Sequence, residues 1–407
     1  IKMWQLWLLA VGLTYPGAVI ANHFGAQFLL LILFAVGVLL VPAIRQLLFT
    51  KPLYKVMRKS LPPIGVTESI ALEAGSVWWD AELFQGDPNW RELTELEATE
   101  LTQEEQSFVD NEVETLCAMV DSHEIQSSHD LPKEVWQYIF DKGFLGLIIP
   151  KEFNGKGFSH FAHAIIVGRL SSASQFLGIA VMVPNSLGPG ELLLKYGTDE
   201  QKQHYLPRLA EGKEIPCFGL TSTVAGSDAG SLIDNGIVCH GKFEGKEVLG
   251  LRLNWEKRYI TLAPIATVIG LAFKAYDPDN LLPEDHPLHK KNDLGITCAL
   301  IPRGTKGLSI GTRHKPIGEP FQNGPIFGKD VFIPMDWVIG GDKMLGHGWR
   351  MLMECLSVGR GISLPVTGAS ATQAMLLTTS TYSQTREQFG IPIAKMEGIQ
   401  EKLSNLA

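Results

Sequence analysis

The chain has 407 residues, 45% of them hydrophobic, and a formal net charge of -8 at neutral pH. This length suffices for two or three domains with cores of their own, and the acidic balance argues against a nucleic-acid-binding protein, which needs a concentrated basic surface. The cysteines show no CxxC pair and no Cys/His cluster, which predicts a reduced, cytoplasmic body without a metal site; they are Cys117, Cys217, Cys239, Cys298 and Cys355.

Two nearly uncharged apolar runs lie at the start of the chain, Met3 to Ile20 and Ala26 to Ile44. Each has about the length of a membrane span, so residues 1–50 are predicted to form a transmembrane hairpin. Pro16 and Gly17 weaken the first run. The alternatives are a single span with an interfacial or signal-like segment before it, and a buried helix of a soluble protein.

Basic residues follow the second run directly. Between this run and Glu68 the chain has no acid and five cations: Arg45, Lys51, Lys55, Arg58 and Lys59. Because cytoplasmic flanks of membrane spans tend to be basic, the remainder of the chain is predicted to face the cytoplasm. A solvated charged face is the alternative for this cluster.

Residues 51–100 are predicted to be a connecting arm, since they are rich in Pro, Gly and acids, with tryptophans that we expect to pack: Trp78, Trp79 and Trp90. Residues 101–214 have a helical pattern, and it begins with a capping box of Thr102 and Glu105. Further helices are predicted over 161–170, 190–196 and 200–209.

Residues 215–340 have a β pattern that favours a small barrel or sandwich. The predicted strands are 215–220, 236–251, 259–261, 266–275, 295–301 and 328–333. Residues 341–407 return to a helical pattern and end in an apolar stripe of Ile399, Leu403 and Leu406. Because such a stripe needs a partner, we expect at least one more helical layer after Ala407, and the initial Ile1 suggests a trimmed start.

Several common active-site motifs are missing from the sequence. Gly346 and Gly348 lack the third glycine of a GxGxxG dinucleotide loop, and no GxxxxGK[ST] phosphate loop occurs. A GxSxG serine elbow is absent, because Ser227 directly follows Gly226. No HExxH occurs either, so the sequence disfavours nicotinamide-type, phosphoryl-transfer, serine-hydrolase and zinc chemistry.

A loop dense in glycine and hydroxyl residues, GLTSTVAGSDAG from Gly219 to Gly230, follows the first predicted strand. Gly226 and Gly230 allow turns and close approach of the backbone to a ligand. Hydroxyls that can bind a polar ligand come from Thr221, Ser222 and Ser227. The loop holds one acid, Asp228, which we expect to be buried. The pattern is typical of a cofactor cradle, and a plain connection between strands is the alternative.

The order of helical block, loop, β block and helical block, together with several motifs, resembles the acyl-CoA dehydrogenase family, most closely its large membrane-associated bacterial fatty-acyl members. Beside the loop above, the motifs are IIPKEFNGKG (148–157), NSLG (185–188), YGTDEQKQHYLPRLAEG (196–212) and REQFG (386–390). The resemblance covers Leu101 to Ala407. It implies a mainly α fold with a central β domain, in which FAD and acyl-CoA bind between an N-terminal helical domain, a β domain and a C-terminal helical domain.

The resemblance assigns cofactor contacts to two segments near the loop. One is similar to the segment whose backbone and threonine hydroxyl contact the flavin, with Ser227 resembling a residue shared by flavin phosphate and CoA: Phe218, Gly219, Leu220, Thr221, Gly226 and Ser227. In the other, an aromatic ring flanks the flavin and a threonine binds near its reactive nitrogen: Tyr259, Ile260 and Thr261. Tyr259 stands where Trp is usual, and a strand core residue is the alternative for it.

The C-terminal block supplies further contacts by resemblance. Arg386, Gln388 and Phe389 are similar to a segment that reaches the FAD of a neighbouring subunit, where arginine neutralises the pyrophosphate, which implies a homo-oligomer. On pattern alone Arg386 would be a solvated charge. Arg360, in SVGRG, aligns with a family arginine close to the active site, and we expect it to organise the CoA end or the catalytic loop.

The catalytic base is not predicted within this chain. Most of the family place a glutamate in the second helical domain, which falls after Ala407, and a minority place it directly before the arginine, where this chain has Gly359. Glu354 is a weaker candidate, with a helix-surface carboxylate as its alternative. Two departures matter: Ser222-Thr223 stand where Glu-Pro is usual, and Val183 is apolar where some medium-chain members carry an acid, which favours a longer acyl chain.

The resemblance implies α,β-dehydrogenation of a fatty acyl-CoA to a trans-2-enoyl-CoA, the first step of β-oxidation, with FAD as cofactor and an electron-transfer flavoprotein as acceptor. It also implies the bacterial inner membrane as location, with the catalytic body on the cytoplasmic side. An acyl-CoA oxidase that uses oxygen, and a non-catalytic membrane-bound scaffold that retains the fold, are the alternatives.

Overall fold

The computed structural model describes residues 28, 31, 32, 34, 37, 40–75, 77–357 and 359–407. The chain divides into two compact units, Ile1–Val66 and Thr67–Ala407. The predicted membrane run Met3 to Ile20 lies outside the described residues, as does most of Ala26 to Ile44. The transmembrane hairpin therefore stays a prediction.

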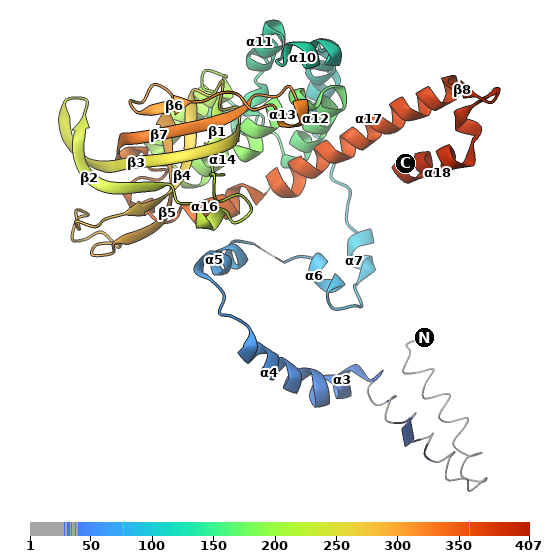
Figure 1. The fold of residues 1–407 in the computed structure, drawn as a ribbon, viewed down its shortest axis with the longest axis horizontal. Helices are drawn as coiled ribbons and strands as arrows, with labels where there is room; N and C mark the ends of the chain where they lie inside the picture. Colours follow the sequence, from blue (N-terminus) through green and yellow to red (C-terminus); the bar gives the residue numbers. More distant parts are fainter. Residues whose placement is uncertain are drawn as a thin grey trace. The chain divides into compact units, whose positions relative to one another are not determined.

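The first unit is helical over residues 42–60 (Figure 1). Helices α3 (Pro42–Arg45), η1 (Gln46–Thr50) and α4 (Lys51–Ser60) follow one another without a break. Every side chain of α4 is exposed, including its cations Lys51, Lys55, Arg58 and Lys59. Exposure of these cations is what the predicted basic flank requires, but a solvated face would expose them equally.

Among the described residues, one helical stretch is long and apolar enough to cross a membrane, Gln175–Tyr196, with a mean hydropathy of 1.3. It comprises α13 (Gln175–Met182), η5 (Val183–Leu187) and α14 (Gly190–Tyr196). Because 78% of its apolar window is buried inside the protein, the stretch is a core helix.

The predicted arm forms three short helices, α5 (Val66–Ala74), α6 (Asp80–Leu83) and α7 (Trp90–Thr94). Trp79 is buried, its ring centroid lies 5.0 Å from that of Trp90, and its indole N–H donates to the Asn89 carbonyl at 2.9 Å. The expectation that tryptophans anchor the arm is confirmed for this pair, whereas Trp78 is exposed.

The helical block of the second unit begins where the sequence predicts. Thr102 accepts from the Glu105 amide at 3.2 Å, and the Glu105 carboxylate accepts from the Thr102 amide at 2.8 Å, so the capping box is confirmed. With α13 and α14, the helices of this block are α8 (Gln103–Phe108), η2 (Val109–Val113), α9 (Glu114–Ala118), α10 (Ser122–Ser128), α11 (Lys133–Asp141), η3 (Phe144–Gly146), η4 (Lys151–Phe153), α12 (His160–Ala173) and α15 (Asp199–Ala210).

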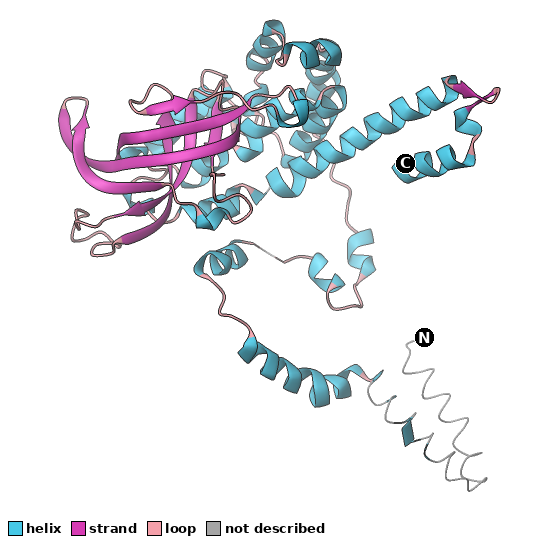
Figure 2. Cartoon of the chain, in the orientation of Figure 1, coloured by secondary structure: helices cyan, strands magenta, loops and turns pink. Residues whose placement is uncertain are grey.

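A curled sheet follows, in the order β1-β4-β2-β3-β7-β6, with β5 paired to β4 (Figure 2). Its strands are β1 (Pro216–Gly219), β2 (Asn235–Phe243), β3 (Lys246–Thr261), β4 (Val268–Tyr276), β5 (Asp293–Pro302), β6 (Leu308–Ile310) and β7 (Asn323–Pro334). β1 and β2 run parallel to β4, and the other pairs are antiparallel. Short helices η6 (Ala229–Ser231), η7 (Pro316–Gly318), η8 (Met335–Trp337) and η9 (Asp342–Met344) lie in the connections.

Two strand predictions differ from the structure. The run 236–251 contains a hairpin, because Glu244 and Gly245 both have positive φ, 49° and 81°, and turn the chain between β2 and β3. The segment 259–261 is no separate strand but the end of β3.

The sheet and the helical block share one continuous core, which includes Phe144 and Phe176 from the helices and Leu271 and Phe273 from β4. This shared core fixes the sheet against the helices, so side chains at the edge between the two layers have fixed positions. The boundaries 101–214, 215–340 and 341–407 stay predictions.

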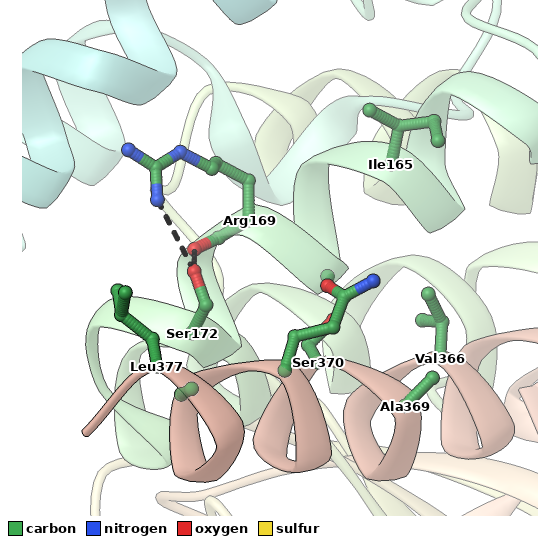
Figure 3. A pocket seen from close by; sticks show the side chains of 10 residues that line it. Ile165, Arg169, Ser172, Val366, Ala369, Ser370 and Leu377 are labelled. Atoms are coloured by element: carbon green, nitrogen blue, oxygen red, sulfur yellow. Dashed lines mark hydrogen bonds between the residues drawn. The ribbon is translucent and has the colours of Figure 1, made fainter. Parts of the chain in front are cut away.

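The chain after the sheet is helical and mostly exposed. It comprises α16 (Gly348–Cys355), η10 (Gly359–Ser363), α17 (Leu364–Thr385), the hairpin β8 (Glu387–Gln388) and β9 (Ile391–Pro392), η11 (Ile393–Lys395) and α18 (Glu397–Leu406). Between α12 and α17 runs a groove of about 470 Å³, shown in Figure 3, with Ile165 and Arg169 on one side and Val366 and Leu377 on the other. The stripe of α18, Ile399, Leu403 and Leu406, is half-buried among exposed neighbours.

Candidate functional site

Two predicted cofactor segments lie side by side in the structure. The amide of Arg258 donates to the carbonyl of Thr221 at 3.1 Å, and Ser222 forms an isolated antiparallel bridge with Lys257. The end of β1 and the loop after it are thereby held against the end of β3. The structure thus brings together two segments that are 37 residues apart in the sequence, which is the distance from Leu220 to Lys257.

A buried ion pair fixes this junction. The side chain of Lys257 is fully buried, and its ammonium lies 2.5 Å from the Asp234 carboxylate and donates to the Leu220 carbonyl at 3.0 Å. The other Asp234 oxygen accepts from the Glu256 amide at 2.9 Å. Burial lowers the pKa of Lys257, and the Asp234 charge opposes that shift by favouring the ammonium. Lys257 therefore joins the loop, β3 and the start of β2.

Neither Lys257 nor Asp234 was predicted as a functional residue, although the sequence holds a signal for the lysine. Along β3 the buried side chains alternate, at Leu251, Leu253, Trp255 and Lys257. A lysine in the buried register of a strand needs a carboxylate, and a search for one would have started with acids near the strand ends.

Tyr259 lies where β3 leaves its regular pairing. The register with β7 shifts between Lys257 and Ile260, and Tyr259 has a φ of 58°. The irregularity turns its ring outward, 53% exposed, while Ile260 enters the core. The phenol ring lies 4.8 Å from the His314 ring and 5.0 Å from the Arg258 guanidinium. The alternative that Tyr259 is a strand core residue is therefore wrong.

Polar groups of the loop are free to bind a ligand. The Ser222 hydroxyl is buried without a hydrogen-bond partner among the described residues. A Cβ on Gly226 would meet no described heavy atom within 4 Å, so the backbone there is open to an approaching molecule. Ser227 is exposed. The expectation of a buried acid is wrong, because Asp228 is exposed and accepts a hydrogen bond from the Ser231 hydroxyl.

The remaining predicted contacts of these two segments differ in exposure. Phe218, Leu220, Thr221 and Thr261 are half-buried, and the Thr261 hydroxyl accepts from the Asn323 side chain at 3.4 Å. Gly219 is buried against side chains of β7 and β4, where a Cβ would lie 2.8 Å from Ile326. Gly219 and Ile260 can therefore contribute backbone, whereas the half-buried residues can also contribute side chains.

Gly359 allows η10 to approach η5 closely. A Cβ at this position would lie 2.4 Å from a Leu187 methyl and 2.5 Å from the Ser186 carbonyl. A larger side chain has no room there, so a carboxylate directly before Arg360 is excluded physically as well as by sequence. Arg360 is exposed, and its Nε donates to the Leu356 carbonyl at 3.4 Å. Helix η5 contacts both β1, which leads into the loop, and η10, which contains Arg360. Arg360 and the loop are therefore linked through η5.

Glu354 is held in ion pairs. Its carboxylate lies 2.5 Å from the Lys195 ammonium and 2.9 Å from Nε of Arg350, and it accepts a hydrogen bond from the Tyr196 hydroxyl. The hydrogen bonds from Lys195 and Tyr196 lower the pKa of Glu354 to about 2. A carboxylate so strongly stabilised as an anion is a poor base. Its function is structural, since it joins α16 to α14.

The three residues of the predicted subunit contact lie apart from the loop. Arg386 ends α17, and Gln388 and Phe389 form the β8–β9 hairpin. All three are exposed, Phe389 at 95% with a φ of 54°. Within the described part of the chain, no hydrogen bond or ion pair joins their side chains to the loop or to β3. Contact with a neighbouring copy stays a prediction.

The residues at the loop fit a flavin. The Ser222 hydroxyl is buried without a partner among the described residues and supplies a hydrogen-bond donor. The backbone at Gly226 leaves space for a ligand, and the exposed Tyr259 ring supplies an apolar wall on an adjoining segment.

All five cysteines are free thiols. Within the ranges that the structure describes, no three metal-ligating side chains gather.

Known proteins share both sequence and fold with this chain. The sequence pattern of the Acyl-CoA dehydrogenase, N-terminal domain matches residues 94–213, and that of the Acyl-CoA dehydrogenase, C-terminal domain matches 346–407. The 3-(aryl)acrylate reductase of Clostridium sporogenes is 31% identical over 301 residues, covering 74% of this chain and 72% of that protein. The mitochondrial short-chain specific acyl-CoA dehydrogenase of Bos taurus is 29% identical, covering 80% and 74%.

A shorter match, 53% identical over 108 residues, covers 26% of this chain and 60% of Protein HemX of Proteus mirabilis. Among solved structures, butyryl-CoA dehydrogenase from Megasphaera elsdenii superposes with a TM-score of 0.63 at 22% identity, covering 76% of each chain. The fold of helical block, curled sheet and C-terminal helices is thereby confirmed. The chain belongs to the acyl-CoA dehydrogenase family, FAD-dependent oxidoreductases that act on CH–CH bonds.

Proposed function

We propose that the protein is a fatty acyl-CoA dehydrogenase of β-oxidation that forms trans-2-enoyl-CoA and passes electrons to an electron-transfer flavoprotein. The observation that carries this proposal is the junction of the loop with β3, where the Arg258 amide binds the Thr221 carbonyl at 3.1 Å and Lys257 binds Asp234. The two segments that the family uses on the flavin ring are thus held adjacent by this chain's own contacts.

The residues have distinct roles in this proposal. The backbone at Leu220 and the hydroxyls of Thr221 and Thr261 would hold the flavin edge, and Tyr259 would supply an apolar wall for the ring. FAD, when bound, accepts the hydride that leaves the β-carbon of the thioester. Ser227 would contact both the flavin phosphate and CoA. The chain orients the two reactants and excludes water between them.

The CoA and FAD phosphates need cations, and two arginines supply them. Arg360 follows η5 and organises the CoA end, while Arg386 is proposed to reach the FAD of a neighbouring subunit in a homo-oligomer. Both guanidinium groups are exposed, without a carboxylate within 4 Å among the described residues. They are therefore free to bind a phosphorylated ligand.

The base that removes the α-proton is proposed to be a glutamate outside residues 1–407. Glu354 is a poor proton acceptor because its pKa lies at about 2, and Gly359 has no space for a side chain. We expect residues 1–407 alone to bind flavin without turning over acyl-CoA. Measurable turnover by this chain would contradict that assignment.

A longer acyl chain is proposed as substrate, since Val183 is apolar and buried at the start of η5. Membrane association on the cytoplasmic face is proposed as well, supported by the exposed cations of α4. Loss of the protein from washed bacterial inner membranes after deletion of residues 1–60 would support this location. Retention of the shortened protein on the membranes would contradict it.

The decisive experiment uses the full-length, FAD-loaded protein mixed anaerobically with palmitoyl-CoA. Bleaching of the flavin absorbance, formation of trans-2-enoyl-CoA and electron passage to an electron-transfer flavoprotein are expected. Bleaching followed by peroxide on admission of air would assign an oxidase instead. Failure to load the protein with FAD would favour the non-catalytic scaffold. Absence of bleaching with acyl-CoA of every chain length would overturn the proposal.

A further inference from the structure

A second hollow lies on the β sheet, apart from the flavin loop. It has a volume of about 840 Å³ and is formed by β2, β3, β7 and the connection from β5 to β6. Four basic side chains from four different segments line it: Lys242, Arg252, Lys306 and Lys329. We name it the basic groove.

The cations of the basic groove are not neutralised by the protein. Among the described residues none of the four has a carboxylate within 4 Å, although the chain as a whole carries a net charge of -8. The groove holds one acid, Asp330, whose side chain likewise pairs with no cation. Four like charges around one hollow repel one another, and an anion in the groove would relieve that repulsion.

Aromatic rings form the apolar part of the groove. Phe243 and Trp337 meet edge to face with centroids 5.5 Å apart, and both are half-buried. Phe332 is half-buried too, and the Arg252 guanidinium lies 5.9 Å from its ring centre. The Phe332 ring lies directly on the β2 backbone, because Gly241 has no Cβ where one would come within 2.5 Å of the ring. The rings are therefore fixed by the sheet, and a planar group can pack against them.

The basic groove is separate from the proposed flavin and CoA contacts. Arg252 and Tyr259 both belong to β3 and are seven residues apart, which is about 23 Å in an extended strand. None of the predicted cofactor or substrate residues lines the groove. Its charge therefore needs another explanation than FAD or acyl-CoA binding at the loop.

We propose that the basic groove binds a phosphorylated ligand with a planar ring, of the nucleotide class. Phosphates match the four cations and a base matches the aromatic rings. The volume lies within the roughly 300–1,000 Å³ typical of small-molecule sites. A concave groove with its rings recessed fits a small molecule better than the surface of a bilayer.

The test is calorimetric titration of ADP into the full-length, FAD-loaded protein without CoA, because CoA is itself an adenine nucleotide and would compete with ADP for the groove. The variant Lys242→Gln/Lys306→Gln/Lys329→Gln should bind ADP at least about tenfold more weakly, the change that 1.4 kcal/mol produces. The matched control is Lys133→Gln/Lys290→Gln/Lys343→Gln, which removes the same charge from exposed lysines outside the groove and should bind ADP as the parent does.

Two further measurements distinguish the contribution of the base from that of the phosphates, and binding of a nucleotide from binding of a lipid. Phe243→Leu should weaken ADP binding and leave pyrophosphate binding unchanged, since only ADP has a base to pack. Vesicles of phosphatidylglycerol should not displace ADP. Absence of ADP binding, equal binding by the groove variant and the control, or displacement by the vesicles would overturn the proposal.

Discussion

The loop after β1 and the hairpin after α17 differ in what holds them, although both are predicted to contact FAD. The loop is fixed by a fully buried lysine, its carboxylate partner and a backbone bond from Arg258. The hairpin has exposed side chains at Arg386, Gln388 and Phe389. The first region is preorganised by its own chain, whereas the second is proposed to act on a surface outside it.

This difference separates two kinds of functional residue. Residues of the loop should affect folding and flavin binding together, because their positions depend on buried contacts. Residues of the hairpin should affect flavin binding and assembly with little change in the stability of the chain. Variants in the two regions can test that separation.

The largest effect is expected for Lys257→Met, which leaves the Asp234 carboxylate buried without its cation. Breaking a buried ion pair costs about 3–5 kcal/mol of unfolding free energy, so the thermal midpoint should fall by roughly 5 °C for a chain of this size. Flavin content should fall as well, because the Leu220 carbonyl loses its donor. Thermal unfolding followed by circular dichroism, with flavin absorbance of the purified protein, measures both effects.

The double variant Lys257→Met/Asp234→Leu is the control for this prediction. Two apolar side chains of similar size should restore most of the stability, since no charge remains buried. Flavin content should stay low, because the donor to Leu220 is still missing. If the double variant regained both properties, the ion pair would not position the loop.

Arg386→Ala should produce the opposite pattern. Its exposed guanidinium has no intrachain ion pair, so the unfolding free energy should change by less than about 0.5 kcal/mol. FAD affinity should fall by about 30–140-fold, as for a lost charge-assisted contact of 2–3 kcal/mol. Fluorescence titration with FAD measures this, and Lys402→Ala, another exposed cation, serves as control. Unchanged affinity in Arg386→Ala would remove the hairpin from the site.

Sequence patterns predicted the local features well, because capping and alternation act within a few residues. The Thr102 capping box and the helices around 161–170, 190–196 and 200–209 are present, with α12, α14 and α15 at those places. The family motifs also predicted that the loop contacts the cofactor. The β2–β3 turn was missed because Glu244 adopts positive φ without the Asn or Asp typical of such turns.

Contacts between residues far apart in the sequence could not be predicted from these local patterns. Asp234 lies outside any strand and 23 residues from Lys257, so nothing local indicates that the two side chains meet. The expected burial of Asp228 failed for the same reason, since a loop acid is buried only if another element covers it. Tyr259 was uncertain because a single irregular φ decides whether the ring enters the core or faces outward.

The contact between α12 and η10, the short helix that contains Arg360, is an intermediate case. It holds a buried histidine that can titrate. His163 of α12 is fully buried, its Nδ1 lies 3.5 Å from the Ser363 hydroxyl of η10, and its Nε2 has no partner among the described residues. Burial, aided by the charge of His160, lowers the pKa of His163 to about 4. Below its unfolded pKa of about 6.5 the unfolded chain binds the extra proton, so stability falls as the pH drops toward 4.

His163→Leu should remove this acid sensitivity. Between pH 7 and pH 4 the parent should lose on the order of 3 kcal/mol through His163, and the variant should lack that loss. Glu191, whose pKa burial raises to about 7, acts in the opposite direction, but it is present in both proteins and cancels in the comparison. Guanidinium unfolding at the two pH values measures the difference. Parallel losses in both proteins would show that His163 is not the group responsible.

The smallest effect is expected for Gly226→Ala, and it distinguishes the ligand from the fold. A Cβ there meets no described atom within 4 Å, and Gly226 has no positive φ, so stability should stay within about 0.5 kcal/mol or rise slightly. If the backbone at Gly226 approaches FAD, the methyl group should weaken FAD affinity by about tenfold, or 1.4 kcal/mol. Gly75→Ala, where a Cβ would lie 3.8 Å from its nearest atom and φ is not positive, is the control in the same titration. Equal FAD affinity in both variants would mean that the glycine of the loop serves the turn and not the cofactor. The contact of the loop with FAD would then rest on Leu220, Thr221 and Ser227.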